Sequence, residues 1–174
     1  MKTDDDVMSD AVRLQKVNEV LDRLKVLSAD HVLLIEGLKD RRALNAVGIR
    51  GDMFQIQSSG GPAAAAQYVQ EHGGKAVILT DWDRRGGSLA SDLRDLLGPD
   101  ADTEVRADLA ALCRHYIKDV ESLDSLIERL SASEERRASL GFLLPPHLQV
   151  GDREPQLREP DGGVRVALGG GLSV

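Results

Sequence analysis

Three acidic residues come directly after two short apolar runs of the sequence. Glu36 follows Val-Leu-Leu-Ile, and Asp81 and Asp83 follow Val-Ile-Leu-Thr. Residues two positions apart in an extended chain project to the same side, so Asp81 and Asp83 can face one ion together. Carboxylate oxygens without cysteine nearby suit Mg²⁺, or Mn²⁺ in its place, better than zinc. The sequence therefore predicts a magnesium site at Glu36, Asp81 and Asp83; the alternative for Asp83 is that it caps the next helix.

Groups suited to phosphate stand beside these acids. Glycines followed by serine open a predicted helix, where an anion can approach the backbone N–H groups closely, and basic residues flank both acidic segments. The predicted phosphate or nucleic-acid contacts are Gly37, Lys39, Arg84, Arg85, Gly86, Gly87 and Ser88. The run Ser-Ser-Gly-Gly at 58–61 is either a second phosphate loop or a flexible turn.

Apolar runs alternate with helix-like segments along the chain. Runs typical of buried strands cover residues 31–35 and 76–80, an alternating strand pattern covers 53–57, and a short strand is expected at 103–105. Helical segments are expected at 9–27, 40–47, 63–71, 88–97, 108–115 and 120–130, and from Glu134 the pattern is less regular. This alternation predicts an α/β fold with a compact Rossmann-like sheet of about four mainly parallel strands flanked by helices. In such sheets ligands bind at the carboxyl ends of the strands, where the acids stand.

The chain divides into three predicted parts. Residues 1–28 contain an amphipathic helix, which covers the core or, alternatively, forms a dimerisation seam. Residues 29–132 form the catalytic and metal-binding domain. Residues 133–174 form a C-terminal extension, with a flexible tail rich in glycine and proline from about residue 151.

Residues 32–37, with Asp40 after them, and residues 79–86 together resemble the two motifs of the Toprim family. The resemblance covers about 29–130. The sequence is similar to the stand-alone small, primase-like Toprim proteins of archaea and to the Toprim core of the 5S ribosomal RNA maturation nuclease. A short match at 118–123 resembles the valine-glutamate element that follows the core in those proteins.

The resemblance implies a role for each matching residue. Glu36 would be the general acid and base or a further metal ligand, Asp81 and Asp83 would hold Mg²⁺, and Asp40 is a candidate ligand for a second ion. Gly87 departs from the pattern, because type IA topoisomerases carry glutamate there. Tyr68 and Tyr116 lie in apolar patterns typical of packing, so neither is expected to be a topoisomerase nucleophile.

Composition limits the class of protein. The 174 residues include 29 acidic and 22 basic side chains, a net charge of −7, which is the wrong sign for a strong non-specific nucleic-acid binder. A contact with phosphate through a metal ion stays open. One cysteine excludes disulfide frameworks and multi-cysteine zinc sites. We expect a cytoplasmic protein with no membrane-spanning segment, because the apolar runs are short and the first residues are acidic.

Two functions of different classes follow. The first is a Mg²⁺-dependent nuclease or primase-like nucleotidyltransferase acting on RNA or DNA. The alternative is a non-catalytic nucleic-acid-binding or scaffold subunit whose metal site grips phosphate. Either is compatible with a homodimer or with a partner protein that supplies recognition.

Overall fold

Helices alternate with short strands through residues 8–143, the part of the chain that the structure, a computed structural model, describes. In chain order the elements are α1 (Asp10–Leu27), β1 (Val32–Ile35), α2 (Leu38–Ala46), β2 (Met53–Gln55), α3 (Gly61–Glu71), β3 (Ala76–Leu79), α4 (Arg84–Leu97), the 3₁₀ turn η2 (Gly98–Asp100), β4 (Ala101–Asp102), α5 (Glu104–Cys113) and α6 (Leu123–Leu143).

The strands form one parallel sheet with the order β2-β1-β3-β4. In the centre, Leu34 of β1 is opposite Ile78 of β3. All four residues of β1 and all four of β3 are buried, as their unbroken apolar runs predict for strands covered on both faces. The predicted α/β fold, with a four-stranded parallel sheet flanked by helices and an N-terminal helix, is confirmed.

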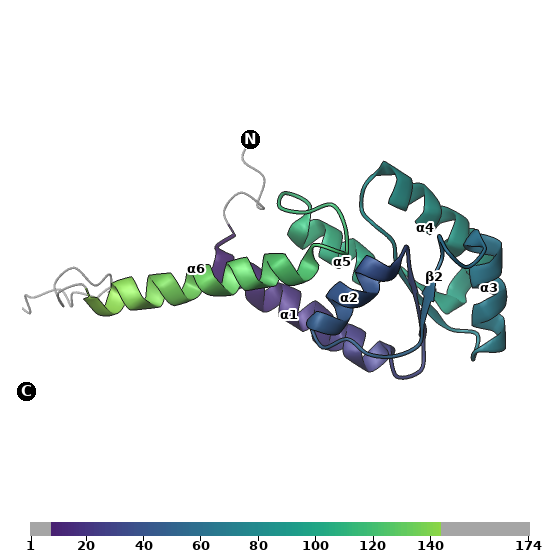
Figure 1. Ribbon diagram of the computed structural model, residues 1–174, viewed down its shortest axis with the longest axis horizontal. Helices are drawn as coiled ribbons and strands as arrows, with labels where there is room; N and C mark the ends of the chain where they lie inside the picture. Colours follow the sequence, from purple (N-terminus) through teal and green to yellow (C-terminus); the bar gives the residue numbers. More distant parts are fainter. Residues whose placement is uncertain (1–7, 144–174) are drawn as a thin grey trace, which may run out of the picture.

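Alternate strand residues contribute to two separate cores. Leu33 and Val77 pack with residues of α1, α5 and α6. Leu34 and Ile78 point to the other face and pack with α3 and α4. Figure 1 shows α3 and α4 on one side of the sheet and α1, α5 and α6 on the other. Side chains that project from the strand ends therefore sit between two rigid layers.

Several predicted boundaries are wrong: α4 begins at Arg84 rather than at 88, and α5 begins at Glu104 rather than at 108. Side-chain hydrogen bonds accompany two of the differences. The predicted strand at 103–105 is instead the start of α5, because Asp102 Oδ1 accepts the Val105 N–H at 3.2 Å. The predicted helix at 120–130 begins only at Leu123, after Asp119 Oδ1 accepts the Ser122 N–H at 2.9 Å.

The last helix is longer than the sequence pattern indicates. α6 continues past Glu134 to Leu143, so it runs through the position where we divided the domain from the C-terminal extension. Its second half is largely exposed and includes an ion pair between Arg137 and Glu134 at 3.4 Å. Figure 1 shows this half projecting beyond the body of the molecule. The predicted flexible tail from about residue 151 lies outside the described residues.

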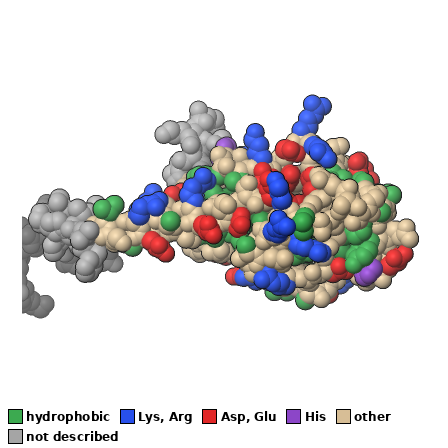
Figure 2. All heavy atoms as spheres, viewed as in Figure 1, with side chains coloured by type: hydrophobic (Ala, Val, Ile, Leu, Met, Phe, Trp, Pro, Cys, Tyr) green, Lys and Arg blue, Asp and Glu red, His purple; other side chains and the backbone are tan. Residues whose placement is uncertain are grey.

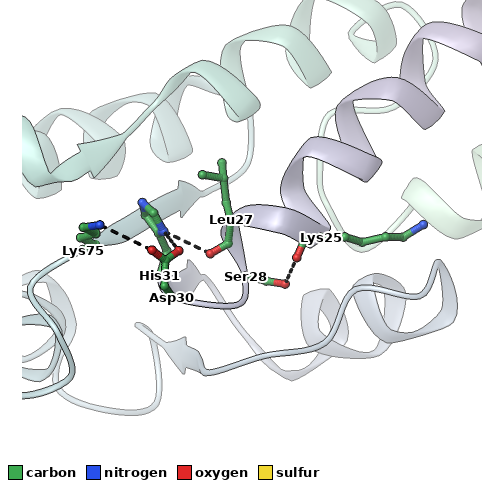
Figure 3. A network of polar contacts seen from close by, with 6 residues as sticks. All are labelled: Lys25, Leu27, Ser28, Asp30, His31 and Lys75. Carbon is green, nitrogen blue, oxygen red and sulfur yellow. Dashed lines mark hydrogen bonds and ion pairs between the residues drawn. The ribbon is translucent and has the colours of Figure 1, made fainter.

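The amino ends of β1 and β3 are tied together on the edge of the sheet opposite to the acidic segments (Figure 3). His31 Nδ1 lies 2.6 Å from Asp30 Oδ1 and 3.1 Å from the carbonyl oxygen of Leu27, at the end of α1. Lys75 Nζ lies 3.5 Å from Asp30 Oδ2. These contacts fix the entry into both central strands, so His31 has a structural role.

Within residues 8–143, none of the helices combines the length and the apolar character needed to cross a membrane.

Candidate functional site

The strand order places the carboxyl ends of β2, β1 and β3 next to one another. The chain leaves these strands at Gln57, Glu36 and Asp81, and all three residues line one cleft of about 290 Å³. The remaining lining residues come from the start of α2 and from the loop before α6; they are Gly37, Leu38, Lys39, Asp40 and Glu121. Glu36 and Asp81, from the two apolar runs, are thus brought together as predicted.

Glu36 is held by two hydrogen bonds, one to each carboxylate oxygen. Its Oε1 accepts the backbone N–H of Asp81 at 3.0 Å, and its Oε2 accepts Nε2 of Gln57 at 3.0 Å. The side chain is only 6% exposed. A carboxylate fixed in this way has a defined direction toward the cleft and needs little reorganisation to accept a proton or a cation.

Asp81 is half-buried and carries an unusual charge balance. Its Oδ1 accepts the N–H of Val120 at 3.1 Å. Burial, with the negative charges of Glu36, Asp40 and Asp119, raises its pKa to about 7, although the bond from Val120 opposes this. The cleft therefore holds several carboxyl groups close together, and burial makes the one on Asp81 costly to ionise.

Asp40 serves the local fold as well as the cleft. It is buried, and its Oδ2 accepts the N–H of Gly37 at 2.9 Å, which completes a cap at the start of α2. Burial raises the pKa of this carboxyl, mainly because water is excluded from it. The same bond occupies the Gly37 N–H, which was predicted to contact phosphate.

Asp83 lies outside the cleft. It is exposed, and its Oδ1 accepts the N–H of Gly86 at 2.7 Å as the N-cap of α4. β3 ends at Leu79, so the chain from Asp81 to Asp83 is a bend rather than a strand, and the rule that alternate residues share a side does not apply. The helix-cap alternative describes its position.

The glycines at the start of α4 differ from one another. A Cβ on Gly86 would lie 1.9 Å from the carbonyl oxygen of Asp81, so this glycine is required by close packing within the chain. Gly87 has only the guanidinium of Arg106 near it, at 3.9 Å. The N–H of Gly87 donates to the carbonyl oxygen of Asp83 at 2.9 Å, and that of Gly86 donates to Asp83 Oδ1 at 2.7 Å. Neither N–H is therefore free for the predicted phosphate contact, whereas the side chain of Ser88 is exposed.

The predicted basic contacts are available to different degrees. Arg84 and Arg85 are exposed, and neither guanidinium group makes a hydrogen bond or ion pair with another residue of the described chain. Lys39 Nζ lies 3.5 Å from Glu121 Oε1 across the cleft, in an exposed pair that a stronger anion could displace.

Gln57 and Arg106 act in the site and were not predicted as site residues; nor were Leu38 and Glu121, which line the cleft. Gln57 orients Glu36, and its place at the end of a predicted strand could have revealed it. Arg106 on α5 donates to the carbonyl and hydroxyl oxygens of Thr80, both at 3.0 Å, and to the carbonyl oxygen of Asp81 at 2.6 Å. It fixes the exit from β3, and nothing in its local sequence indicates this, because the contact depends on how α5 packs against β3.

A metal ion would find an incomplete set of protein ligands. Among residues 8–143, no group of three or more His, Cys, Asp or Glu side chains is arranged to hold one. Glu36 and Asp81 still offer two carboxylates on one cleft, and Mg²⁺ is commonly bound by one or two carboxylates together with water and substrate phosphate. The residues present therefore fit an ion that arrives with a phosphate better than a permanently caged one.

Comparison with known proteins finds archaeal relatives. No family model matches the chain. A UPF0292 protein of Methanosarcina barkeri is 33% identical over 122 residues, covering 68% of this chain and 85% of the relative. A UPF0292 protein of Archaeoglobus fulgidus is 31% identical over 120 residues, covering 67% and 93%. A solved structure of an Aquifex aeolicus protein aligns with a TM-score of 0.51 and 25% identity, covering 60% of this chain and 95% of the other.

These findings correct the family predicted from the motifs. The names of the similar archaeal proteins give the family UPF0292 and state no activity. No family model supports the predicted Toprim membership. That prediction is wrong, although the archaeal character of the relatives is confirmed. The roles of Glu36, Asp40, Asp81 and Asp83 must therefore be argued from the chemistry of this cleft alone.

Proposed function

The chain belongs to the UPF0292 family, and from the chemistry of its cleft we propose that it is a Mg²⁺-dependent enzyme that processes phosphodiesters of RNA or DNA, by nuclease or nucleotidyl-transfer chemistry. One observation carries this proposal: Glu36 and Asp81 face one cleft, in which the pKa of Asp81 is raised to about 7 by burial and by neighbouring negative charges. A divalent cation is the group that best offsets such a charge.

Different residues of the site would bind the ion and the phosphate. Asp81 and Glu36 would hold Mg²⁺, which supplies charge stabilisation to a phosphate bound beside it. Lys39, Arg84 and Arg85 would contact the phosphate oxygens, because they are exposed cations near the carboxyl edge of the sheet.

Glu36 is the candidate proton acceptor. In hydrolysis the water oxygen forms a bond to phosphorus, its proton passes to a Glu36 oxygen, and the bond to the leaving oxygen breaks; that oxygen then takes a proton from solvent. In nucleotidyl transfer a hydroxyl group takes the place of the water. The bonds from Asp81 N–H and Gln57 Nε2 keep the Glu36 carboxylate oriented for this step.

A non-catalytic nucleic-acid-binding or scaffold subunit is the second candidate. The position of Asp83 favours it, because this carboxylate caps α4 and leaves only two acids directed at an ion from the predicted three. Such a protein would bind phosphate through the ion without turnover.

Cleavage assays with Mg²⁺ or Mn²⁺ on structured RNA and on single-stranded DNA distinguish the two candidates. The enzyme predicts cleavage in the wild type that is lost in both Glu36→Gln and Asp81→Asn, and kept in Glu128→Gln, an exposed carboxylate of α6 outside the site. Metal-dependent binding without cleavage in the wild type, with the binding lost in Asp81→Asn, would select the scaffold. If the wild type shows no binding and no cleavage, both candidates are overturned.

A further inference from the structure

A second cavity, of about 330 Å³, opens beside the carboxylate cleft on the α3–α4 side of the sheet. Its apolar wall is formed by Ile56, which is 2% exposed, with Pro62 and Leu89. Its polar groups are supplied by Gln57, Ser88, Arg85 and Asp92. We call it the α3–α4 cavity.

The α3–α4 cavity adjoins the proposed reaction site through one residue. Gln57 lines both hollows, and its Nε2 donates to Oε2 of Glu36. A ligand with a phosphate in the carboxylate cleft could therefore extend past Gln57 into the second cavity. The two hollows are adjacent parts of one edge of the sheet, where open parallel sheets bind their ligands.

One stripe of α4 supplies half of this lining. Arg85, Ser88, Leu89 and Asp92 are spaced by three, four and seven residues, so they lie on one face of the helix. Arg85 precedes the exposed Ser88 and has no partner within residues 8–143. The stripe thus places an apolar side chain between hydrogen-bonding groups, and the guanidinium at its amino end is free to contact a phosphate oxygen.

The mixture of groups indicates which ligand chemistry fits. An acyl chain would leave the amide, hydroxyl, carboxylate and guanidinium groups without partners, and a sugar alone would leave the apolar wall uncovered. A heteroaromatic base has two apolar faces and an edge with both donors and acceptors, which Gln57, Ser88 and Asp92 can pair.

We propose that the α3–α4 cavity binds the nucleoside attached to the phosphate in the carboxylate cleft, through the contiguous lining of Ile56, Gln57, Ser88 and Leu89. The proposal rests on the proposed function and deepens it, since it assigns the nucleoside beside the reacting phosphate to a cavity of its own. Gln57 then has two tasks, orienting Glu36 and marking the junction between phosphate and nucleoside.

Binding measured by NMR on the full chain with Mg²⁺ tests this without turnover. The probes are inorganic phosphate, ribose 5-phosphate and the 5′-monophosphates of adenosine and uridine. We expect all four to shift the amide signals of Gly37 and Asp81, and only the nucleotides to shift those of Ser88 and Leu89. We also expect the nucleotides to bind about tenfold more tightly than ribose 5-phosphate.

Substitutions that fill the α3–α4 cavity give a second test of the nucleoside site. Leu89→Trp and the exposed Ser88→Trp should each weaken nucleotide binding about tenfold and leave inorganic phosphate unaffected. Leu96→Trp is the matched control, because Leu96 is 54% exposed on the same helix and outside the cavity. Ser88→Trp keeps the test available if Leu89→Trp does not fold.

The failures of the two proposals can be told apart. If phosphate binds but the nucleotides bind no more tightly and shift no signal of Ser88 or Leu89, the nucleoside site is overturned and the proposed function stands. If no phosphate compound binds with Mg²⁺, both are overturned.

Discussion

The carboxyl group of Asp81 is costly to ionise in the folded protein, because it is half-buried and lies near other negative charges. Its pKa of about 7 lies above the ordinary value of 3.8, so the folded protein holds this proton over a pH range in which the unfolded chain has lost it. Stability therefore falls as the pH rises from about 4 to about 7, and above that range the ionised group opposes folding in full. A residue kept at this cost is a candidate for function rather than for stability.

Asp81→Asn should accordingly stabilise the metal-free protein at pH 8. We expect the free energy of unfolding to rise by about 1 to 2 kcal/mol, a value reduced for the solvent exposure of the group. The gain should shrink below pH 7 and vanish near pH 4. Denaturant titrations at several pH values measure it, with the exposed Asp95→Asn as control. A destabilised Asp81→Asn at pH 8 would contradict the proposed charge balance.

Gly86 and Gly87 are neighbours in sequence with opposite requirements. A methyl group on Gly86 would collide with the carbonyl oxygen of Asp81, whereas one on Gly87 meets little. We expect Gly86→Ala to lower the free energy of unfolding by about 3 kcal/mol through forced displacement. Gly87→Ala should raise it by about 0.5 to 1 kcal/mol, because alanine is the better helix former. Equal effects in chemical denaturation would show that the packing at Asp81 is loose.

Helices and strands position the site through contacts that join distant segments. Arg106 on α5 binds the carbonyl oxygens of both Thr80 and Asp81, and Asp81 in turn binds Val120 ahead of α6. The β3–α4 connection is thus fixed from α5 and from the chain leading to α6, not only by its own turn. Such a connection can keep Asp81 and Glu36 at hydrogen-bond distance without a bound ligand.

Arg106→Lys should loosen this connection locally. A single ammonium group cannot reproduce the planar fork that reaches three oxygen atoms. We expect amide hydrogen exchange at Asp81 and Trp82 to quicken about tenfold, since their N–H groups bind Glu36 and Lys118 across the site. Exchange in β1 should stay unchanged, and uniform acceleration throughout the sheet would indicate global destabilisation instead.

The apolar runs were sufficient to predict β1 and β3, because both strands are buried on both faces. They also placed Glu36 and Asp81 at adjacent strand ends, where the structure brings them together. For Asp83 the pattern offered both an ion ligand and a helix cap and could not decide between them, since that depends on where β3 ends. Nor could it predict Arg106, whose partners are 25 and 26 residues away in sequence. Sequence reasoning succeeded where burial dictates structure and failed where side-chain hydrogen bonds do, whether they are local, as at Asp83, or long-range, as at Arg106.

The net charge of the chain disfavours phosphate, so the proposed site would attract phosphate only with a cation bound in the cleft. The net charge is −7, and the face in Figure 2 shows acidic and basic side chains intermixed rather than one basic surface. Binding of nucleic acid must then depend on the bound ion and on a few cations near the cleft. Lys39, Arg84 and Arg85 are the exposed ones on the predicted phosphate rim.

Affinity for single-stranded nucleic acid should therefore respond weakly to salt and strongly to Mg²⁺. Neutralising about three phosphates gives a slope of about −2 for log K against log of the salt concentration, since each phosphate contributes about −0.7. Fluorescence anisotropy with a labelled oligonucleotide at fixed Mg²⁺ measures the slope. The double variant Arg84→Gln, Arg85→Gln should flatten it by about 1.4, whereas Arg42→Gln, an exposed arginine of α2 outside the lining of the cleft, should not. A slope steeper than about −5 would mean that a basic surface elsewhere in the chain dominates binding. The cleft would then not be the principal contact with the nucleic acid.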